Sequence, residues 1–141
     1  MAFHLVTRIV SVDGDRVARG IFAAPPSGAP SPCLVAEAIG QLAAWVAMAR
    51  FDFALRPVAG LAGDVEFFAP APAGSTVELA VTIDRLDETA IAYGGTASLE
   101  GRAFLEMRGC VGPMMAMTEF EDPDSARARF ERISGTGEVG L

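Results

Sequence analysis

The longest apolar stretch of the chain runs from residue 32 to residue 50, P-C-L-V-A-E-A-I-G-Q-L-A-A-W-V-A-M-A-R. Its alanines and leucines favour a helix, and Pro32 suits the first helical position, where the N–H that proline lacks would have no partner. Ser31 precedes it as the expected N-cap. A helix that is apolar on nearly every side must be enclosed by other structure, so the pattern predicts a long, buried central helix.

Few polar groups interrupt this apolar stretch. Glu37, Gln41 and Trp45 follow one another at intervals of four, so they share one face of the helix. A charged carboxylate on a buried helix is unfavourable unless it is paired. Glu37 is therefore either a functional acid or a carboxylate that caps neighbouring amides. Gln41 either orients Glu37 or bonds to the strands that enclose the helix.

Apolar and β-branched residues predict β-strands on both sides of the helix. Residues 3–12 and 16–22 form a hairpin around the turn at 13–15. A proline-rich loop at 23–32 leads to the helix, and residues 51–56 leave it as a connector. Further strands are predicted at 58–68, 76–86, 89–99 and 102–111, with a bulge or a close backbone approach at Gly94-Gly95.

This order of elements predicts an α+β fold in which one antiparallel sheet curls around the central helix. The outer side of such a unit needs cover, which a second copy of the chain usually supplies. Beyond it, Asp122 and Pro123 start a short charged helix over 124–133, held to the surface by Phe130 and Ile133. We expect one domain over residues 1–118, with a dependent surface helix and tail over 119–141.

Composition and charge exclude several functional classes. The net charge of −7 and the pI near 4.6 argue against nucleic acid and against anionic membranes. His4 is the only histidine, and Cys33 and Cys110 are the only cysteines, so we expect no metal site, no disulfide framework and no cofactor. Glu37 inside the apolar stretch disfavours a membrane span. No targeting signal is predicted, and a cytoplasmic location fits best.

The segment S-P-C-L-V-A-E-A-I-G-Q at 31–41 resembles the signature P-G-(V/C)-L-x-x-(E/D)-A-x-x-Q of β-hydroxyacyl-acyl-carrier-protein dehydratases. The segment at 63–79 resembles the strand, proline-containing turn and strand of the same family. The resemblance implies the hotdog fold, with the sheet wrapped around a central helix at 32–50 and a short C-terminal helix. The signature is matched by Cys33, Leu34, Glu37, Ala38 and Gln41.

Two positions depart from the family pattern. The family's catalytic histidine falls at Ala23, and its glycine, whose N–H polarises the thioester carbonyl, falls at Pro32, which has no N–H. The helix start still offers the amides of Cys33 and Leu34 to a developing oxyanion. Glu37 matches the family's acid. Dehydration needs an acid and a base, so this chain is not expected to be a competent dehydratase alone.

The resemblance implies a protein of the 3-hydroxyacyl-carrier-protein dehydratase-like group that handles acyl thioesters of acyl carrier protein or coenzyme A, in fatty-acid or polyketide-type metabolism. Glu37 is the candidate catalytic acid or base, and Cys33, Leu34 and Gln41 are candidate substrate-binding residues. One alternative is a thioesterase that uses Glu37. Another is a non-catalytic acyl-binding or partner subunit. The expected assembly is a homodimer, with a higher oligomer or a heterodimer with a hotdog paralogue as alternatives.

Overall fold

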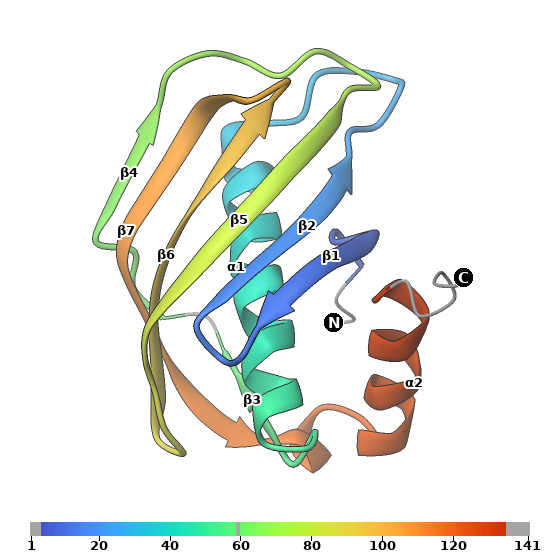
Figure 1. Cartoon of the computed structure of the whole chain (residues 1–141), viewed down its shortest axis with the longest axis vertical. Helices are drawn as coiled ribbons and strands as arrows, with labels where there is room; N and C mark the ends of the chain where they lie inside the picture. Colours follow the sequence, from blue (N-terminus) through green and yellow to red (C-terminus); the bar gives the residue numbers. More distant parts are fainter. Residues whose placement is uncertain (1–3, 59, 135–141) are drawn as a thin grey trace.

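The computed structural model describes residues 4–58 and 60–134. A curved antiparallel sheet wraps around helix α1 (Pro32–Arg50), and helix α2 (Pro123–Ile133) lies beside the lower half of α1 (Figure 1). The strands lie in the order β1-β2-β5-β6-β7-β3, and β4 also pairs with β7. The other elements are β1 (Arg8–Asp13), β2 (Val17–Ala23), β3 (Leu55–Pro57), β4 (Asp64–Phe67), β5 (Thr76–Leu86), β6 (Ala90–Leu99), β7 (Arg102–Ala116) and the short 3-10 helix η1 (Met117–Glu119).

Helix α1 begins and ends where the sequence predicts. The Leu34 N–H donates to the Ser31 side-chain oxygen at 3.1 Å, so Ser31 is the N-cap and Pro32 takes the first helical position. At the other end, Asp52 and Phe53 have positive φ angles of 54° and 65°, which turn the chain sharply toward β3. This tight turn lets the chain re-enter the sheet directly after the helix.

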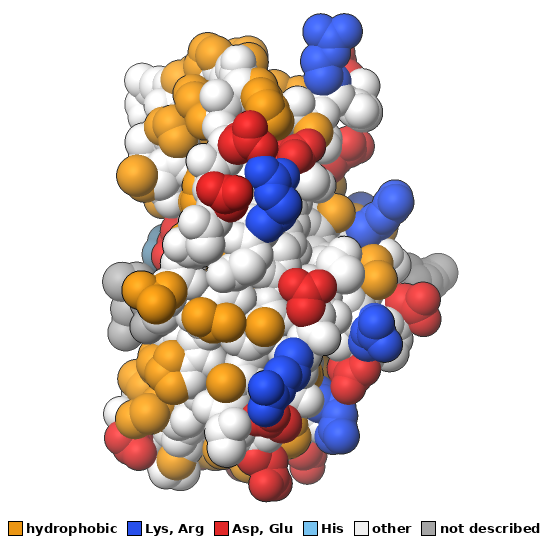
Figure 2. Space-filling view, turned by 90° about the vertical axis from the view of Figure 1, so that its left-hand side faces the viewer, with side chains coloured by type: hydrophobic (Ala, Val, Ile, Leu, Met, Phe, Trp, Pro, Cys, Tyr) orange, Lys and Arg blue, Asp and Glu red, His pale blue; other side chains and the backbone are white. Residues whose placement is uncertain are grey.

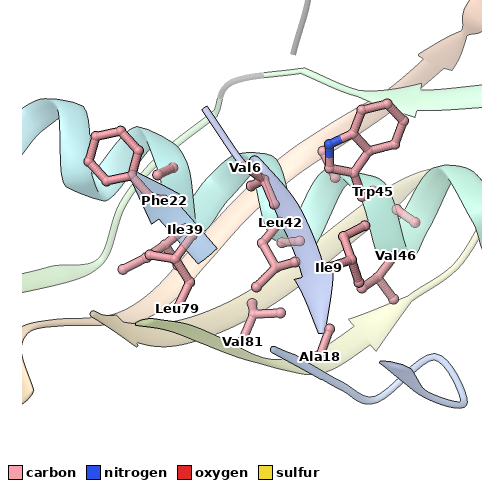
Figure 3. Close-up of a cluster of buried hydrophobic side chains, with 14 of the residues drawn as sticks. Val6, Ile9, Ala18, Phe22, Ile39, Leu42, Trp45, Val46, Leu79 and Val81 are labelled. Carbon is pink, nitrogen blue, oxygen red and sulfur yellow. The ribbon is translucent and has the colours of Figure 1, made fainter. Parts of the chain in front are cut away.

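The core lies between α1 and the concave face of the sheet. Ile39, Leu42 and Val46 project from the helix toward Leu79 and Val81 of β5 (Figure 3). All five side chains are buried. Burial of one such aliphatic side chain stabilises the fold by about 1.5–3 kcal/mol, so this interface holds the helix inside the sheet. The buried residues of β1, β2 and the segment before them close the same cluster, at Val6, Ile9, Ala18 and Phe22.

Within the described residues, α1 is the one helix long and apolar enough to cross a membrane by length and hydropathy. In the structure, however, eleven of its 19 residues are buried inside the protein. The core that encloses the helix therefore accounts for its apolar sequence.

The long strands agree well with the sequence pattern. β5 has the predicted limits, and the register of β6 against β7 shifts between Tyr93 and Gly95, which confirms the bulge predicted at Gly94-Gly95. On its other side, a Cβ at Gly95 would lie 2.6 Å from the Ala80 carbonyl oxygen of β5, so only glycine allows β5 and β6 to approach this closely. β7 continues to Ala116, five residues beyond the predicted end at 111.

Three predictions near the chain's connectors were wrong. β1 begins at Arg8 rather than at residue 3, so His4 lies in the segment before the strand. The predicted connector at 51–56 contains the start of the short strand β3, which pairs with β7. The predicted strand at 58–68 is reduced to β4, and among the described residues before it Leu61 alone forms a bridge, to Val111.

Glycines explain why the segment before β4 lies flat on β7. A Cβ at Gly60 would lie 2.1 Å from the Val111 carbonyl oxygen, and a Cβ at Gly63 would lie 2.8 Å from that of Arg108. The backbone of this segment therefore packs closely against β7. The apolar sequence alone would have suggested a regular ladder of β-sheet hydrogen bonds.

Helix α2 packs onto the same core as the sheet. Its Phe130 ring lies 5.9 Å from the Trp45 ring and 5.6 Å from the Phe53 ring, measured between centroids. Asp122 occupies the N-cap position as predicted, but its side chain makes no hydrogen bond to the backbone N–H groups of the helix. Helix α2 thus packs against the unit that α1 organises. The tail predicted at 135–141 lies outside the described residues.

Candidate functional site

A groove of about 460 Å³ runs along the upper part of α1, between this helix, the inner faces of β6 and β7, and residues 56–58 and 60–62. Helix residues spaced three or four apart form one wall, at Cys33, Glu37, Gly40 and Ala44. Tyr93 and Cys110 form part of the floor, and because they pair directly across β6 and β7, their side chains lie together on the inner face. Hydrophobic side chains gather along one margin of the β4–β7 side of the molecule (Figure 2).

Glu37 and Gln41 form the polar element of the groove. The Gln41 amide is buried, with 2% of its surface exposed, and its oxygen accepts the Leu5 N–H at 3.0 Å. Its nitrogen donates to a Glu37 carboxylate oxygen at 3.3 Å. Gln41 therefore makes both of the contacts considered for it, one to the chain that encloses the helix and one to Glu37. The Glu37 side chain itself is exposed in the single chain and faces the groove.

The start of α1 provides fewer amide donors than expected. The Leu34 N–H is already bonded to Ser31, and the Leu34 side chain packs against the core without lining the groove. Because the N-cap uses the Leu34 amide, a role of this residue in substrate binding stays a prediction. Cys33 does line the groove, and its N–H occupies the second helical position, which has no acceptor within the helix.

Sequence reasoning missed Tyr93 and Cys110 as groove residues. Burial, together with the neighbouring Cys110 and Glu37, raises the pKa of Tyr93 to about 12. Burial likewise raises the pKa of the Cys110 thiol. Both groups are therefore neutral at physiological pH. The signal that could have found them is the pairing of β6 with β7, which cannot be read until the hairpin register is known.

The far end of the groove reaches Arg56 on β3. Its side chain is 8% exposed, lies 3.9 Å from the Glu121 carboxylate, and stacks over the Phe120 ring at 4.4 Å. Burial lowers the pKa of Arg56. The groove thus has a carboxylate near its upper end and a buried guanidinium at the other. Within the described ranges, no three His, Cys, Asp or Glu side chains gather to hold a metal ion.

No model of a known protein family matches the chain, and no curated protein matches it. Solved structures do. A thioesterase from Haemophilus influenzae is 11% identical, with a TM-score of 0.61 over 80% of this chain and 81% of that one. A hypothetical thioesterase with coenzyme A from Streptococcus pneumoniae is 10% identical, with a TM-score of 0.60 over 77% and 84%. The fluoroacetyl-CoA thioesterase FlK is 12% identical, with a TM-score of 0.62 over 84% and 96%.

At 10–12% identity these likenesses bear on the fold alone. They agree with the wrapped helix, the antiparallel sheet and the short C-terminal helix described above. The chain therefore has the hotdog fold that the segment at 31–41 implied.

Proposed function

We propose that this protein binds acyl thioesters, with coenzyme A thioesters as the preferred class, and hydrolyses them with Glu37 as general base. The observation that carries the proposal is the position of Glu37, whose carboxylate lines an apolar groove while the buried Gln41 amide donates to it. Such a groove suits a hydrocarbon chain attached to a polarised carbonyl. The three similar structures, each described as a thioesterase, support this reaction class.

The proposed reaction uses water as its only other reactant. The Glu37 carboxylate accepts a proton from a water molecule, and the water oxygen attacks the thioester carbonyl carbon. The carbonyl π electrons move onto the oxygen and return as the carbon–sulfur bond breaks. The leaving thiolate takes the proton from Glu37, so the products are a carboxylic acid and a thiol, and the carboxylate is regenerated.

Thiol release from acetyl-, butyryl- and octanoyl-CoA tests this proposal. Glu37→Gln keeps the shape and the contact with Gln41 but removes the base, so we expect kcat to fall about 10²- to 10⁴-fold. Glu78→Gln, on the exposed outer face of β5, is the matched control and should leave turnover unchanged. Wild-type turnover that persists in Glu37→Gln would overturn the assigned role.

A non-catalytic acyl-binding protein or partner subunit is the second candidate. The observation in its favour is the helix start, where Pro32 has no N–H and the Leu34 N–H is held by Ser31, so few donors face an oxyanion. Saturable binding of octanoyl-CoA without thiol release would support this class. Turnover that appears only after a second hotdog protein is added would identify a heterodimer.

Membership of the dehydratase-like group, with a place in fatty-acid or polyketide-type metabolism, is the weaker proposal. Ala23, at the position of the family's histidine, ends β2 with a methyl group. The only imidazole belongs to His4, next to Leu5, whose N–H binds Gln41. Dehydration of a 3-hydroxyacyl thioester by the purified protein, lost in His4→Gln, would support this group against the thioesterase.

The charge pattern favours coenzyme A over an acidic carrier protein as the acyl carrier. Arg108, which strand position suggests as a docking cation, contacts Glu66 and lies 3.1 Å from Glu106 and 3.8 Å from Asp64. Three carboxylates around one guanidinium leave this face without net positive charge. We expect acyl-CoA to be turned over faster than the same acyl group on acyl carrier protein.

A homodimer through the β4 edge of the sheet is part of the proposal. Val65 and Phe67 of β4 are 45% and 44% exposed, and they pair with Met107 and Leu105 on the inner face of β7. Their apolar surface therefore continues the groove wall, and a second copy would cover it and enclose Glu37. Sedimentation should show a dimer that Phe67→Lys dissociates. A monomeric wild-type protein would overturn this assembly.

A further inference from the structure

The oxyanion of the proposed hydrolysis needs a hydrogen-bond donor that the start of α1 supplies poorly. Pro32 lacks an N–H, and Ser31 occupies the Leu34 N–H, so Cys33 alone keeps an amide in the first turn beside the groove. A thioester carbonyl develops full negative charge on oxygen during hydrolysis, and an apolar groove stabilises that charge only through a donor placed against it. The oxyanion therefore needs a hydrogen-bond donor from another part of the groove.

Tyr93 is a hydroxyl donor on the floor of this groove. Its ring is half-buried, and it pairs with Cys110 across β6 and β7 on the inner face of the sheet. Among residues 4–58 and 60–134, no group forms a hydrogen bond to the Tyr93 hydroxyl. An unengaged hydroxyl lining a groove is available to a substrate.

Gly40 places this hydroxyl next to the helix wall. A Cβ at position 40 would lie 3.0 Å from the Tyr93 oxygen, so the absence of a side chain admits the phenol to the wall of α1. Glu37 lies one helical turn before Gly40 on the same face, and its charge is felt by the phenol. The base and the hydroxyl thus approach the groove from adjoining positions, one from the helix and one from the sheet.

We propose that the Tyr93 hydroxyl donates a hydrogen bond to the carbonyl oxygen of the bound thioester, and so acts as the oxyanion donor of this site. The proposal rests on the acyl-thioester function proposed above. As water attacks, the carbonyl π electrons move onto the oxygen that accepts this hydrogen bond, while the phenol keeps its proton. When the carbon–sulfur bond breaks, the electrons return and the thiolate takes the proton held by Glu37.

The protonation state of the phenol suits this role. Burial, Cys110 and Glu37 raise the pKa of Tyr93 to about 12, so the hydroxyl keeps its proton and remains a donor at neutral pH. The titratable groups that act on it from the facing elements are the Glu37 carboxyl on α1 and the Cys110 thiol on β7, which is neutral.

Tyr93→Phe tests the role kinetically, because it removes the hydroxyl and keeps the ring. Loss of one oxyanion donor lowers kcat about 10²- to 10³-fold, and we expect KM to change by less than about threefold. Thr82→Val removes a hydroxyl from the exposed outer face of β5 and is the matched control. Turnover that Glu37→Gln abolishes but Tyr93→Phe leaves unchanged would overturn the role of Tyr93 alone. A protein that neither binds nor hydrolyses acyl thioesters would overturn the proposed function as well.

Direct observation of the contact is possible because Tyr93 is the only tyrosine in the chain. Fluorotyrosine incorporated into the Glu37→Gln variant gives one fluorine resonance from the folded protein. We expect octanoyl-CoA to shift this resonance more than S-octyl-CoA, which has the same chain and carrier but no carbonyl. Equal shifts from the two ligands would overturn the contact between the hydroxyl and the carbonyl, whether or not the wild-type protein turns over.

Gly40→Ala provides a second variant whose effect depends on the hydroxyl. The added methyl group lies 3.0 Å from the Tyr93 oxygen, so it displaces the donor or the helix wall. We expect kcat to fall about tenfold or more in the wild-type background and by less than about twofold in the Tyr93→Phe background. Equal losses in both backgrounds would contradict the proposal.

Discussion

The two halves of α1 differ in what covers the same helix face. Glu37, Gln41 and Trp45 lie along that face, yet Glu37 is exposed, while Gln41 is 2% and Trp45 is 1% exposed. The segment before β1 covers Gln41, and α2 covers Trp45 through Phe130. In the upper half, the described part of the single chain leaves Glu37 facing a groove.

This contrast separates stability from function along one helix. In the lower half, aromatic contacts of Phe130 join α2 to the core. Two hydrogen bonds from Arg129 to the Glu121 carboxylate, at 2.6 and 2.8 Å, also fix α2 in place. Gln41 lies between the two halves of the helix. Its amide oxygen accepts the Leu5 N–H, and its amide nitrogen donates to the candidate base Glu37. Substitutions in the lower half should therefore change the free energy of unfolding, and substitutions in the upper half should change turnover.

The largest effect on stability is expected at Trp45. Trp45→Ala removes the side chain that packs against Phe130 and leaves a cavity, so we expect the free energy of unfolding to fall by about 3–5 kcal/mol. Circular dichroism during urea unfolding measures it. Leu61→Ala, 76% exposed at the rim of the groove, is the control and should change stability by less than about 0.5 kcal/mol. Similar losses in both variants would remove the contrast between the halves.

A smaller loss, joined to a loss of turnover, is expected at Gln41. Gln41→Leu leaves the Leu5 N–H without its acceptor and Glu37 without its donor, so we expect a loss of about 1–3 kcal/mol and slower hydrolysis. Gln41→Glu restores an acceptor for Leu5 but places a second carboxylate beside Glu37. Slow turnover in both variants, measured at equal fractions folded, would assign the orientation of Glu37 to the Gln41 N–H. Normal turnover in either would argue against it.

The contact between Glu121 and Arg129 predicts a pH dependence of stability. Hydrogen bonds from Arg129 hold the pKa of Glu121 below its usual value of 4.5. A group whose folded-state pKa is lowered stabilises the fold above its unfolded-state pKa, and this stabilisation is lost as the pH falls through the folded-state value. Glu121→Gln should lower stability by about 1.5 kcal/mol at pH 7 and by much less in acid. Urea unfolding at both pH values measures this, and an equal loss at each would be inconsistent with the charge.

The smallest effect is expected at the exposed end of α1. Arg50 and Asp15 lie 3.2 Å apart, but their side chains are 54% and 39% exposed, so solvent screens the pair. Arg50→Ala should lower the free energy of unfolding by about 0–1 kcal/mol, and a double-mutant cycle with Asp15→Ala isolates the coupling. A coupling above about 1.5 kcal/mol would show that this end of the helix is held by charge rather than by α2.

Local signals explain which elements could be predicted. The limits of α1 follow from Ser31, Pro32 and the apolar run, and those of β5 from strict alternation, so each is determined within its own segment. β3 and β4 could not be placed in this way. Their pairing with β7 depends on close backbone approach at Gly60 and Gly63, which is a contact between distant segments.

The candidate site likewise contains residues that local sequence could predict and residues that only distant contacts bring in. Glu37 and Gln41 were predicted because their spacing on one helix is local, and the structure brings them together at 3.3 Å. Tyr93 and Cys110 join the groove only through the register of β6 against β7, which includes a bulge. Leu34 was chosen for its amide, but the same N-cap that predicts the helix start uses that amide.

The sequence by itself determined the central helix, the hairpins and the acid on the helix face, because periodicity, caps and turns act over a few residues. Only the tertiary structure decided which part of that face stays open. Coverage depends on where the first residues and α2 return to the helix, and on which strands face it. Glu37 and Trp45 have the same local geometry on α1. What distinguishes a candidate catalytic residue from a core residue here is the distant chain that packs, or does not pack, against each.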